Sequence, residues 1–303
     1  MKDVKAVVTG SRGFIGMNLV KELVKRDILV YGLTQDETAD YNLLKKDIDA
    51  IKPDYIFNLG AYGNHSSQTE PEKIVMANYV RLFFLLQATK DLDYKAFINF
   101  GSSSEYGVKD KPMIESMTCD PETFYGATKL GGTYLSKAYA KTYNKPIITV
   151  RPASVFGEGE LDTRFMPQIV KHLLDRKPMD VVLEPKHSWV YIEDFVSAVM
   201  YLTNNVSKFK GGDIFNISYG KQWSNKQVIR EFESVSGLKL PANQLNEAMR
   251  KYDNKNWLVS NNKLLNAGWK YKIGFSAGIT NTYRYYRSLF DSYAKPTPEK
   301  KDN

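Results

Sequence analysis

The feature that most constrains the fold is a glycine-rich turn near the N-terminus, VVTGSRGFIG, in which Gly10, Gly13 and Gly16 recur at three-residue spacing. An apolar run, VKAVV, precedes the turn and a helical pattern follows it. In this context the first glycine permits a tight turn, the second lets the backbone approach a pyrophosphate, and the third lets the helix pack on the sheet. The helix N-terminus, at Phe14 and Ile15, then offers free N–H groups to phosphate. The turn therefore predicts a dinucleotide-binding strand–turn–helix unit.

Further apolar runs repeat the pattern of buried strands: DILVYGLT, DYIFNLGAY, KAFINFGSS, KPIITVRPASVFG and GGDIFNIS. They are short and apolar on both faces, as strands of a parallel sheet are. Periodic helical segments lie between them, at 14–26, 73–90 and 125–144. The first of these places its apolar residues on one stripe, formed by Ile15, Leu19, Leu23 and Val24. Strands alternating with helices predict an α/β fold with a Rossmann-type, doubly wound parallel sheet.

The pattern changes after Gly157, where loops and helices replace the regular alternation. We expect a dinucleotide-binding domain at 1–157 plus about 188–217. A smaller C-terminal substrate-binding lobe, at 158–187 and 218–295, is expected to cover the carboxyl ends of the strands. Within it, WSNKQVIREFESVSG predicts a helix capped by Ser224. The last residues, 296–303, are polar and rich in lysine and predict a flexible tail.

Composition excludes several classes of protein. Hydrophobic residues make up 43% and charged residues 25%, which is ordinary for a soluble globular chain. The net charge of +8 comes from scattered lysines and not from a basic stripe, so we expect no nucleic-acid partner. No apolar run is long enough for a signal sequence or a membrane span, and the single Cys119 excludes an internal disulfide. We therefore expect a cytoplasmic protein without a membrane partner, and we identify no metal site.

The second apolar run bears on the choice of dinucleotide. In NAD-selective sites an acidic residue at the end of this strand bonds the ribose 2′-OH. Here Thr34 stands at that point, and the first acid is Asp36. Arg12, in the glycine turn, has the geometry to bind a 2′-phosphate bidentately, unless it simply faces solvent. The pattern favours NADP(H) as cofactor, with NAD(H) as the alternative.

A tyrosine and a lysine lie four residues apart in FYGATKL, at the start of a predicted helix. This spacing puts Tyr125 and Lys129 on one face. An ammonium beside a phenol, next to a cationic nicotinamide, stabilises phenolate and lowers the pKa of the tyrosine toward working pH. Following a dinucleotide-binding turn, the pair predicts acid–base chemistry at the cofactor.

Four segments, TGSRGFIG, FGSSSEYG, YGATK and RPASVFGEG, together resemble the extended short-chain dehydrogenase/reductase family, in its branch of nucleotide-sugar epimerases, dehydratases and 4-keto reductases. The resemblance covers nearly the whole chain, including WVYIEDF and VSNNKLLNAGWK. It implies an enzyme acting on a nucleotide-diphosphate sugar, with Tyr125 as acid/base. It also implies that Lys129 holds the nicotinamide ribose and tunes Tyr125, and that either Ser102 or Ser103 hydrogen-bonds the sugar oxygen at C4. A homodimer formed through the Tyr/Lys helix and its neighbour is a further expectation.

The same resemblance implies further cofactor contacts. NLGAY matches the loop that runs along the cofactor, and RPASVFG matches the segment that contacts nicotinamide and sugar. The residues implied in these two segments are Leu59, Gly60, Ala61, Tyr62, Pro152, Ser154 and Val155. Asn78, in MANYV, matches an asparagine on the helix beside the active site, or is an ordinary amide in a core helix.

One position departs from the family pattern. Many relatives carry an arginine that clamps the substrate pyrophosphate, where this chain has PKHSWVYIED, with His187 at that position and Lys186 beside it. A single imidazole is a weaker and pH-dependent clamp, and His187 is otherwise an ordinary loop histidine. Lys186, or Arg164 in LDTRFMPQ, then has to supply the missing positive charge.

Three reactions share this scaffold. A 4-keto reductase consumes NADPH while Tyr125 protonates the new alkoxide, and a 4-epimerase removes and returns a hydride with tightly held NAD. A 4,6-dehydratase needs in addition a glutamate two residues after the catalytic serine or threonine. Glu105 stands at that spacing from Ser103, whereas counting from Ser102 reaches Ser104 and no such acid exists.

The compact chain, the second strand without an NAD-type acid and Arg12 favour reduction of an NDP-4-keto-6-deoxy sugar by NADPH. The 4-epimerase and the 4,6-dehydratase are the alternatives. A non-catalytic NADP(H)-sensing protein on the same fold is a more distant alternative, because such a protein has no need of the Tyr125–Lys129 pair.

Overall fold

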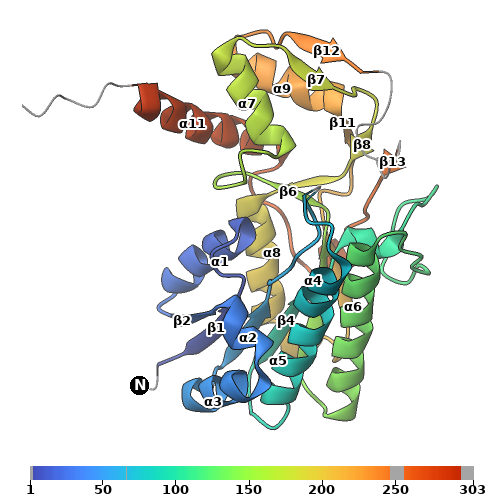
Figure 1. Ribbon diagram of the computed structural model, residues 1–303. Helices are drawn as coiled ribbons and strands as arrows, with labels where there is room; N and C mark the ends of the chain where they lie inside the picture. Colours follow the sequence, from blue (N-terminus) through green and yellow to red (C-terminus); the bar gives the residue numbers. More distant parts are fainter. Residues whose placement is uncertain (1–2, 66, 246–255, 295–303) are drawn as a thin grey trace, which may run out of the picture.

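The computed structural model describes residues 3–65, 67–245 and 256–294, which form a parallel sheet covered by helices and a smaller lobe at one end (Figure 1). The six-stranded sheet has the order β10-β5-β4-β3-β1-β2, and every neighbouring pair is parallel. Its strands are β1 (Lys5–Thr9), β2 (Leu29–Leu33), β3 (Tyr55–Asn58), β4 (Ala96–Phe100), β5 (Ile147–Pro152) and β10 (Ile214–Ile217). These are the apolar runs of the sequence, so the prediction of a Rossmann-type sheet is confirmed.

Helices connect the strands and cover both faces of the sheet (Figure 1). They are α1 (Phe14–Val24), α2 (Gln35–Ala39), α3 (Tyr41–Ile51), α4 (Pro71–Val75), α5 (Arg81–Thr89), α6 (Phe124–Thr142) and α8 (Ile192–Asn204). Shorter turns complete the set: a π-helix η1 (Met76–Val80) between α4 and α5, and the 3₁₀ helices η2 (Ser103–Tyr106) and η3 (Val206–Lys208). Of the apolar stripe predicted in α1, Leu19 and Leu23 are buried but Val24 is 58% exposed, because the helix ends there.

Alternation along β1 explains why both faces are covered. Ala6 and Val8 pack in one apolar cluster with Leu19 of α1, whereas Val7 packs in another with Leu44 of α3. Successive side chains of a strand point to opposite faces, so a strand that is apolar throughout needs a helical layer on each side.

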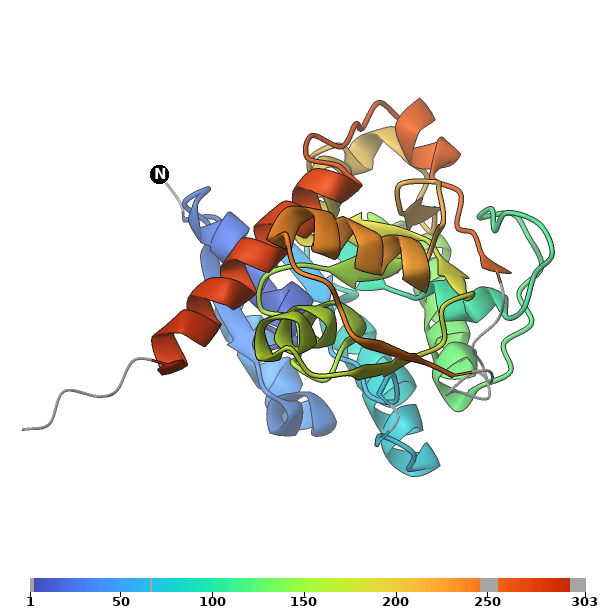
Figure 2. The same ribbon diagram turned by 90° about the horizontal axis from the view of Figure 1, so that it is seen from above.

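The C-terminal lobe lies across one end of the sheet, as Figure 2 shows from above. Its elements are α7 (Phe165–Asp175), β7 (Met179–Val181), β8 (Lys186–His187), β11 (Trp223–Ser224), α9 (Asn225–Ser236), β12 (Ala242–Gln244), β13 (Asn256–Trp257), α10 (Asn262–Asn266) and α11 (Phe275–Ala294), and the strands β6 (Ser154–Phe156) and β9 (Trp189–Tyr191) lie where the lobe meets the sheet. Three small sheets join them: β11-β8-β13, β12-β7 and β6-β9. The predicted cap of α9 is present, since Ser224 Oγ accepts from the backbone N–H of Gln227 at 3.2 Å. The predicted tail, 296–303, lies outside the described residues.

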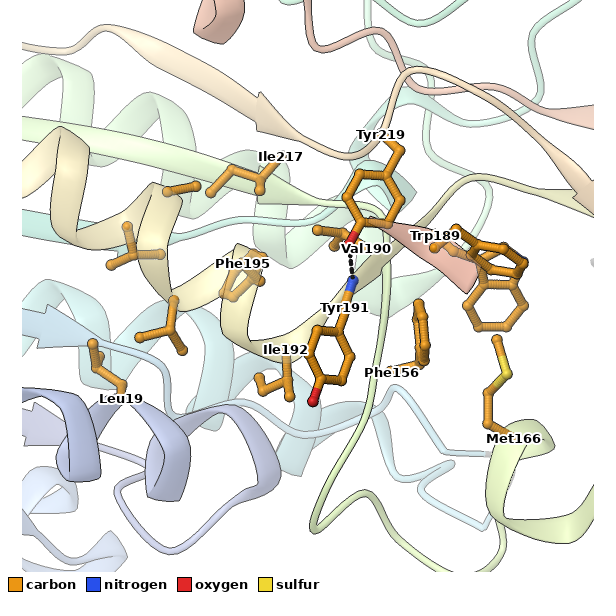
Figure 3. Packing of buried hydrophobic residues seen from close by; sticks show 14 of the residues in the cluster. Leu19, Phe156, Met166, Trp189, Val190, Tyr191, Ile192, Phe195, Ile217 and Tyr219 are labelled. Carbon is orange, nitrogen blue, oxygen red and sulfur yellow. Dashed lines mark hydrogen bonds between the residues drawn. The ribbon is translucent and has the colours of Figure 1, made fainter. Parts of the chain in front are cut away.

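A continuous apolar cluster joins the lobe to the sheet. Figure 3 shows this cluster extending from Leu19 of α1 through Ile192 and Phe156 to Trp189 and Met166 of α7. The ring of Phe156 meets that of Trp189 edge-on, with centroids 6.1 Å apart. The lobe therefore shares a core with the sheet.

Within the described ranges, no helix has both the length and the apolar character needed to cross a bilayer.

Candidate active site

The glycine turn forms a backbone cradle at the carboxyl end of β1. Gly10 has φ +67°, and a Cβ on it would lie 2.9 Å from the backbone nitrogen of Gly60. A Cβ on Gly16 would lie 2.1 Å from the carbonyl oxygen of Gly10. Phe14 and Ile15 begin α1, and in the part of the chain that the structure describes no side chain caps its first N–H groups. The turn thus has both features that a dinucleotide pyrophosphate requires, close backbone access and unused N–H donors.

The loop after β3 lies beside this cradle. Gly60 N donates to Thr9 Oγ1 at 3.0 Å, which fastens the start of the loop to the end of β1. At its other end, Tyr62 exchanges two hydrogen bonds with the Asn78 amide, N to Oδ1 at 2.9 Å and O from Nδ2 at 2.8 Å. Leu59 and Ala61 lie between these two anchors. NLGAY begins at the end of β3, and the two helices α2 and α3 lie between β2 and β3.

Asn78 agrees with the second of its two sequence interpretations, an amide inside the helical core. Its Nδ2 also donates to Thr128 Oγ1 on α6 at 3.1 Å, and the side chain is buried. Both ends of its amide are occupied by the protein. Asn78 therefore holds the loop of Tyr62 against the Tyr/Lys helix, and a direct cofactor contact is not supported.

An acidic side chain does stand at the end of β2, contrary to the sequence expectation. Thr34 caps α2 in a capping box: its hydroxyl accepts from the N–H of Glu37 at 3.3 Å, and the Glu37 carboxylate accepts from the N–H of Thr34. Hydrogen bonds from Thr34, with a smaller contribution from the Arg12 guanidinium, lower the pKa of Glu37. Glu37 thus carries its charge beside Arg12. The T-x-x-E spacing of a capping box was the sequence signal that could have revealed it.

Tyr125 and Lys129 lie one turn apart at the start of α6. Thr123 caps this helix by accepting from the N–H of Gly126 at 3.0 Å. Burial raises the pKa of Tyr125 to about 12, against the effect of a hydrogen bond from Ser102. Burial also lowers the pKa of Lys129 to about 8, and the charge of Glu105 opposes this shift. In the protein alone, burial therefore outweighs the predicted lowering of the tyrosine pKa.

The serine run has two open registers in the sequence, and the structure separates them. Ser102 is the serine that hydrogen-bonds Tyr125, and its Oγ accepts from the N–H of Ser104 at 3.0 Å. Ser103 begins η2, and its Oγ accepts from the indole Nε1 of Trp257 in the lobe at 3.0 Å. Ser102 therefore lies beside the phenol, and Ser103 faces the lobe.

Glu105 does not face the substrate site, which corrects the prediction of a substrate contact or an elimination acid. Its side chain is 0% exposed. Oε1 accepts from the N–H of Ser102 at 2.8 Å, and Oε2 accepts from Thr133 Oγ1 at 2.9 Å. Arg151 donates to the same Oε2 from Nε and from Nη2, both at 2.7 Å. A carboxylate with both oxygens bound inside the protein has none left for a substrate.

The chain after β5 carries the residues that the family resemblance implies for the nicotinamide contact. Pro152 ends β5, and Ser154 and Val155 lie in β6, which pairs with β9. All three are only partly buried, as residues that line a site would be. The structure thus leaves the residues implied for the nicotinamide contact accessible.

The loop between β6 and α7 ends at Arg164, whose positive charge acts on two groups, the Tyr125 phenol and the Glu160 carboxyl. Burial raises the pKa of Glu160 to about 8. Thr163, next to Arg164, meets His65 Nε2 with its Oγ1 at 3.1 Å, so this loop touches the segment after β3. The charge of Arg164 thus favours the ionised forms of both Tyr125 and Glu160.

Lys186 and His187 form β8, the central strand of the small sheet in the lobe. His187 pairs with Trp223 of β11 on one side and Trp257 of β13 on the other. Its ring lies 6.0 Å from that of Trp189, and Lys186 is exposed.

Sequence reasoning missed Trp257, whose local segment carries no pattern that points to Ser103.

Together these residues offer a phenol with a hydroxyl partner, a buried ammonium and a backbone cradle. A phenol paired with an ammonium suits proton transfer to and from a sugar hydroxyl. The cradle fits a dinucleotide, because its glycines keep the backbone turn tight and the first N–H groups of α1 have no side-chain cap in the described residues. This combination suits oxidation and reduction of a carbinol carbon.

Comparison with known proteins agrees with this arrangement. A family described as "NAD dependent epimerase/dehydratase family" matches residues 6–218. A dTDP-D-glucose 4,6-dehydratase of Dictyostelium discoideum is 23% identical over 359 residues, covering 94% of this chain and 82% of that protein. An uncharacterized UDP-glucose epimerase of Bacillus subtilis is 25% identical over 321 residues, covering 95% of this chain and 99% of that protein.

Solved structures share the fold. The UDP-glucuronic acid 4-epimerase of Bacillus cereus, in complex with UDP-glucuronic acid and NAD, superposes with a TM-score of 0.83 at 24% identity, covering 94% of this chain and 100% of that chain. The UDP-glucose 4-epimerase of Thermus thermophilus, in complex with NAD, also gives a TM-score of 0.83, at 18% identity over 94% of this chain and 99% of that chain.

Proposed function

Because the chain belongs to the NAD-dependent epimerase/dehydratase family of extended short-chain dehydrogenase/reductase enzymes, we propose that it is a nucleotide-diphosphate-sugar 4-epimerase that uses NAD. The observation that carries this proposal is the pairing of Ser102 with Tyr125 while the carboxylate of Glu105 is bound inside the protein. The site then has the groups for moving a proton at C4 and lacks the acid for elimination at its expected place.

The roles follow from the chemistry of the side chains. Tyr125, as phenolate, takes the proton of the C4 hydroxyl and returns it to the C4 oxygen after the ring has turned. Ser102 donates to that oxygen and fixes its distance from the phenol. Lys129 holds the nicotinamide ribose, and its charge favours the phenolate. A nicotinamide held there by Lys129 would supply the hydride acceptor and donor that oxidation and reduction at C4 require.

Dehydration is disfavoured by the register of the serine run. With Ser102 as the catalytic hydroxyl, the position two residues on is Ser104, which is too weak an acid to protonate a leaving hydroxyl. Glu105, one residue further, is fully buried and bound by Arg151. These observations support epimerisation over loss of water.

The cofactor proposal changes from NADP(H) to NAD(H). The ionised Glu37 at the end of β2 can accept from a ribose 2′-OH and repels a 2′-phosphate. The Glu37 carboxylate also attracts the Arg12 guanidinium, whose positive charge would otherwise be available to a 2′-phosphate of NADP(H). The 4-keto reductase using NADPH stays as the second candidate, and Arg12 is the observation that favours it.

We also propose that Lys186 and His187 of β8 bind the substrate pyrophosphate.

We further propose that the described parts of 1–157 and 188–217 form the dinucleotide-binding domain, and that those of 158–187 and 218–295 form the substrate-binding lobe. Membership of β10 in the main sheet supports it. A homodimer through α5 and α6 is proposed on the exposed apolar side chains there, Phe83 at 38% and Tyr134 at 54% exposure.

The experiment first identifies the cofactor released by acid from the purified protein. The protein is then incubated with UDP-glucose, UDP-glucuronic acid or dTDP-glucose without added reductant, and the sugar protons are followed by NMR. We expect NAD and a product inverted at C4 with unchanged mass. Consumption of NADPH with a 4-keto-6-deoxy sugar and no inversion would replace the proposal by the reductase, and loss of one water by the dehydratase. Tyr125→Phe is the inactive control.

A further inference from the structure

A buried junction joins the three segments that carry the site. The carboxylate of Glu105 accepts from Ser102 N at the exit of β4, from Thr133 Oγ1 on α6, and from Arg151 on β5, at 2.7–2.9 Å. Thr133 lies one helical turn after Lys129, and Ser102 is the hydroxyl partner of Tyr125. We propose that Glu105 is a positioning residue that fixes Ser102 against Tyr125 and Lys129. This inference rests on the acid–base role proposed above for Tyr125.

Only a carboxylate fits this junction. All four contacts are N–H or O–H donors, and an ionised carboxylate offers acceptors alone. A glutamine would turn an NH₂ group toward at least one donor and leave a buried contact unmade. Arg151 is as deeply buried as Glu105 and lies over the ring of Tyr106, with Cζ 4.6 Å from the centroid. The ion pair thus has no solvent to replace a lost contact.

The junction also places a negative charge behind the catalytic pair. Lys129 is 5% exposed, and the charge of Glu105 is the effect that opposes the lowering of its pKa by burial. The same charge raises the pKa of Tyr125. Charged and titratable groups that face the junction from the packed elements are Arg151, Tyr106, Cys119, Glu115, Lys129, Tyr125 and Arg164. Loss of the Glu105 charge therefore lowers the pKa of both Tyr125 and Lys129.

The first test cuts one arm of the junction and leaves its charge in place. Thr133→Val removes the α6 contact in a side chain of the same size. Ser136→Ala is the matched control, since Ser136 is a buried hydroxyl one turn further along α6 that finds no hydrogen-bond partner in residues 3–65, 67–245 and 256–294. We expect Thr133→Val to lower kcat about tenfold, with KM and the pH limbs unchanged. Thr133→Ser should restore kcat.

The second test removes the charge. Glu105→Gln combined with Arg151→Met deletes both members of the buried pair, which keeps the fold more safely than leaving one ion alone. Of the two charges, the Glu105 carboxylate is the one that raises the pKa of Tyr125, so its loss sets the direction of the shift. The phenolate of Tyr125 is followed by its absorbance, as the difference between each protein and the same protein carrying Tyr125→Phe. We expect this titration to move to lower pH in the double variant and to stay in place in Thr133→Val.

The outcomes separate this inference from the proposed function. The titration needs no sugar substrate, so it stands even if the chain catalyses no epimerisation. A folded double variant whose Tyr125 titrates at the original pH overturns the electrostatic part. A Thr133→Val variant with the kcat of Ser136→Ala overturns the positioning part. If the rate of every variant is independent of pH, no proton transfer by Tyr125 limits it, and the proposed acid–base role fails instead.

Discussion

The indole Nε1 of Trp257 donates a hydrogen bond of 3.0 Å to Oγ of Ser103, which lies 154 residues earlier in the chain. Trp257 belongs to β13, which pairs with His187 of β8 in the lobe. Ser103 follows Ser102 directly at the start of η2. The part of the lobe proposed to bind the substrate pyrophosphate is therefore joined by one hydrogen bond to the loop that carries Ser102, the proposed catalytic hydroxyl.

Trp257→Phe keeps an aromatic ring and removes the donor. A typical hydrogen bond contributes about 1 kcal/mol, so the free energy of unfolding should fall by about that amount. We also expect KM for the nucleotide sugar to rise several-fold while NAD affinity is unchanged, because β8 and η2 lose their link. Steady-state kinetics and urea unfolding measure both effects.

Trp269→Phe is the matched control for this variant. The Nε1 of Trp269 donates to Ser197 Oγ at 3.4 Å, within the lobe contact with α8 and away from the serine run. It should lose stability without a change in KM. Equal KM values in the two variants would show that the Trp257 bond is only structural.

Ser102→Ala should shift the pH dependence of oxidation. The hydrogen bond from Ser102 lowers the pKa of Tyr125, so its loss raises that pKa. Oxidation of the C4 hydroxyl needs phenolate, which forms as pH rises through this pKa. The acid limb of kcat/KM should therefore move to higher pH, and the rate at neutral pH should fall about a hundredfold.

Ser103→Ala distinguishes the two registers. It removes the acceptor of the Trp257 bond and leaves the partner of Tyr125, so it should behave like Trp257→Phe, with its pH limb in place. A limb that moves with Ser103→Ala and not with Ser102→Ala would assign the catalytic hydroxyl to Ser103 and reverse the register.

Sequence alone predicts the sheet and the two motifs of the site because their signals are local. Apolar runs mark every strand of the main sheet, and the spacing of Gly10, Gly13 and Gly16 is complete within one turn. The four-residue spacing of Tyr125 and Lys129 becomes one helical face as soon as α6 forms. None of these features depends on a distant part of the chain.

The parts that sequence could not predict depend on distant partners. Glu105 looks like a free acid until Thr133 and Arg151, 28 and 46 residues away, are placed against it. The choice of Ser102 depends on where η2 begins, and that turn is held by the same buried carboxylate. The position of Glu37 is an exception, because its capping box with Thr34 is a local pattern that the sequence alone contains.

Gly16→Ala should abolish cofactor binding. The added Cβ would lie 2.1 Å from the carbonyl oxygen of Gly10, so α1 must move away from the turn. We expect NAD affinity to fall more than a hundredfold and the protein to purify without cofactor. Gly237→Ala is the control, because Gly237 has φ +70° but open space around it, so it should lose about 1 kcal/mol of stability and keep its cofactor. NAD titration by calorimetry compares them.

Asp194→Asn should destabilise the fold more than any surface change. Asp194 is buried and accepts from Tyr219 Oη at 2.6 Å, Lys272 N at 2.8 Å and Gly274 N at 2.9 Å. An asparagine replaces one acceptor by a donor that faces donors, so we expect a loss of about 2–3 kcal/mol in the free energy of unfolding. Glu193→Gln, at the exposed neighbour, should cost little. Chemical unfolding at constant pH measures the difference, and equal losses would contradict the importance of this buried contact.

Phe83→Glu combined with Tyr134→Glu should convert the proposed homodimer into a monomer. These side chains are exposed on α5 and α6, which pack side by side, and a two-fold interface there would bury them. Two carboxylates in that interface would face their copies across the axis without partners, which costs far more than at a free surface. Light scattering during gel filtration should give half the mass for this variant, whereas Val24→Glu, on the exposed end of α1, should keep the dimer. A wild-type protein with the 34.6 kDa mass of one chain would remove the homodimer proposal.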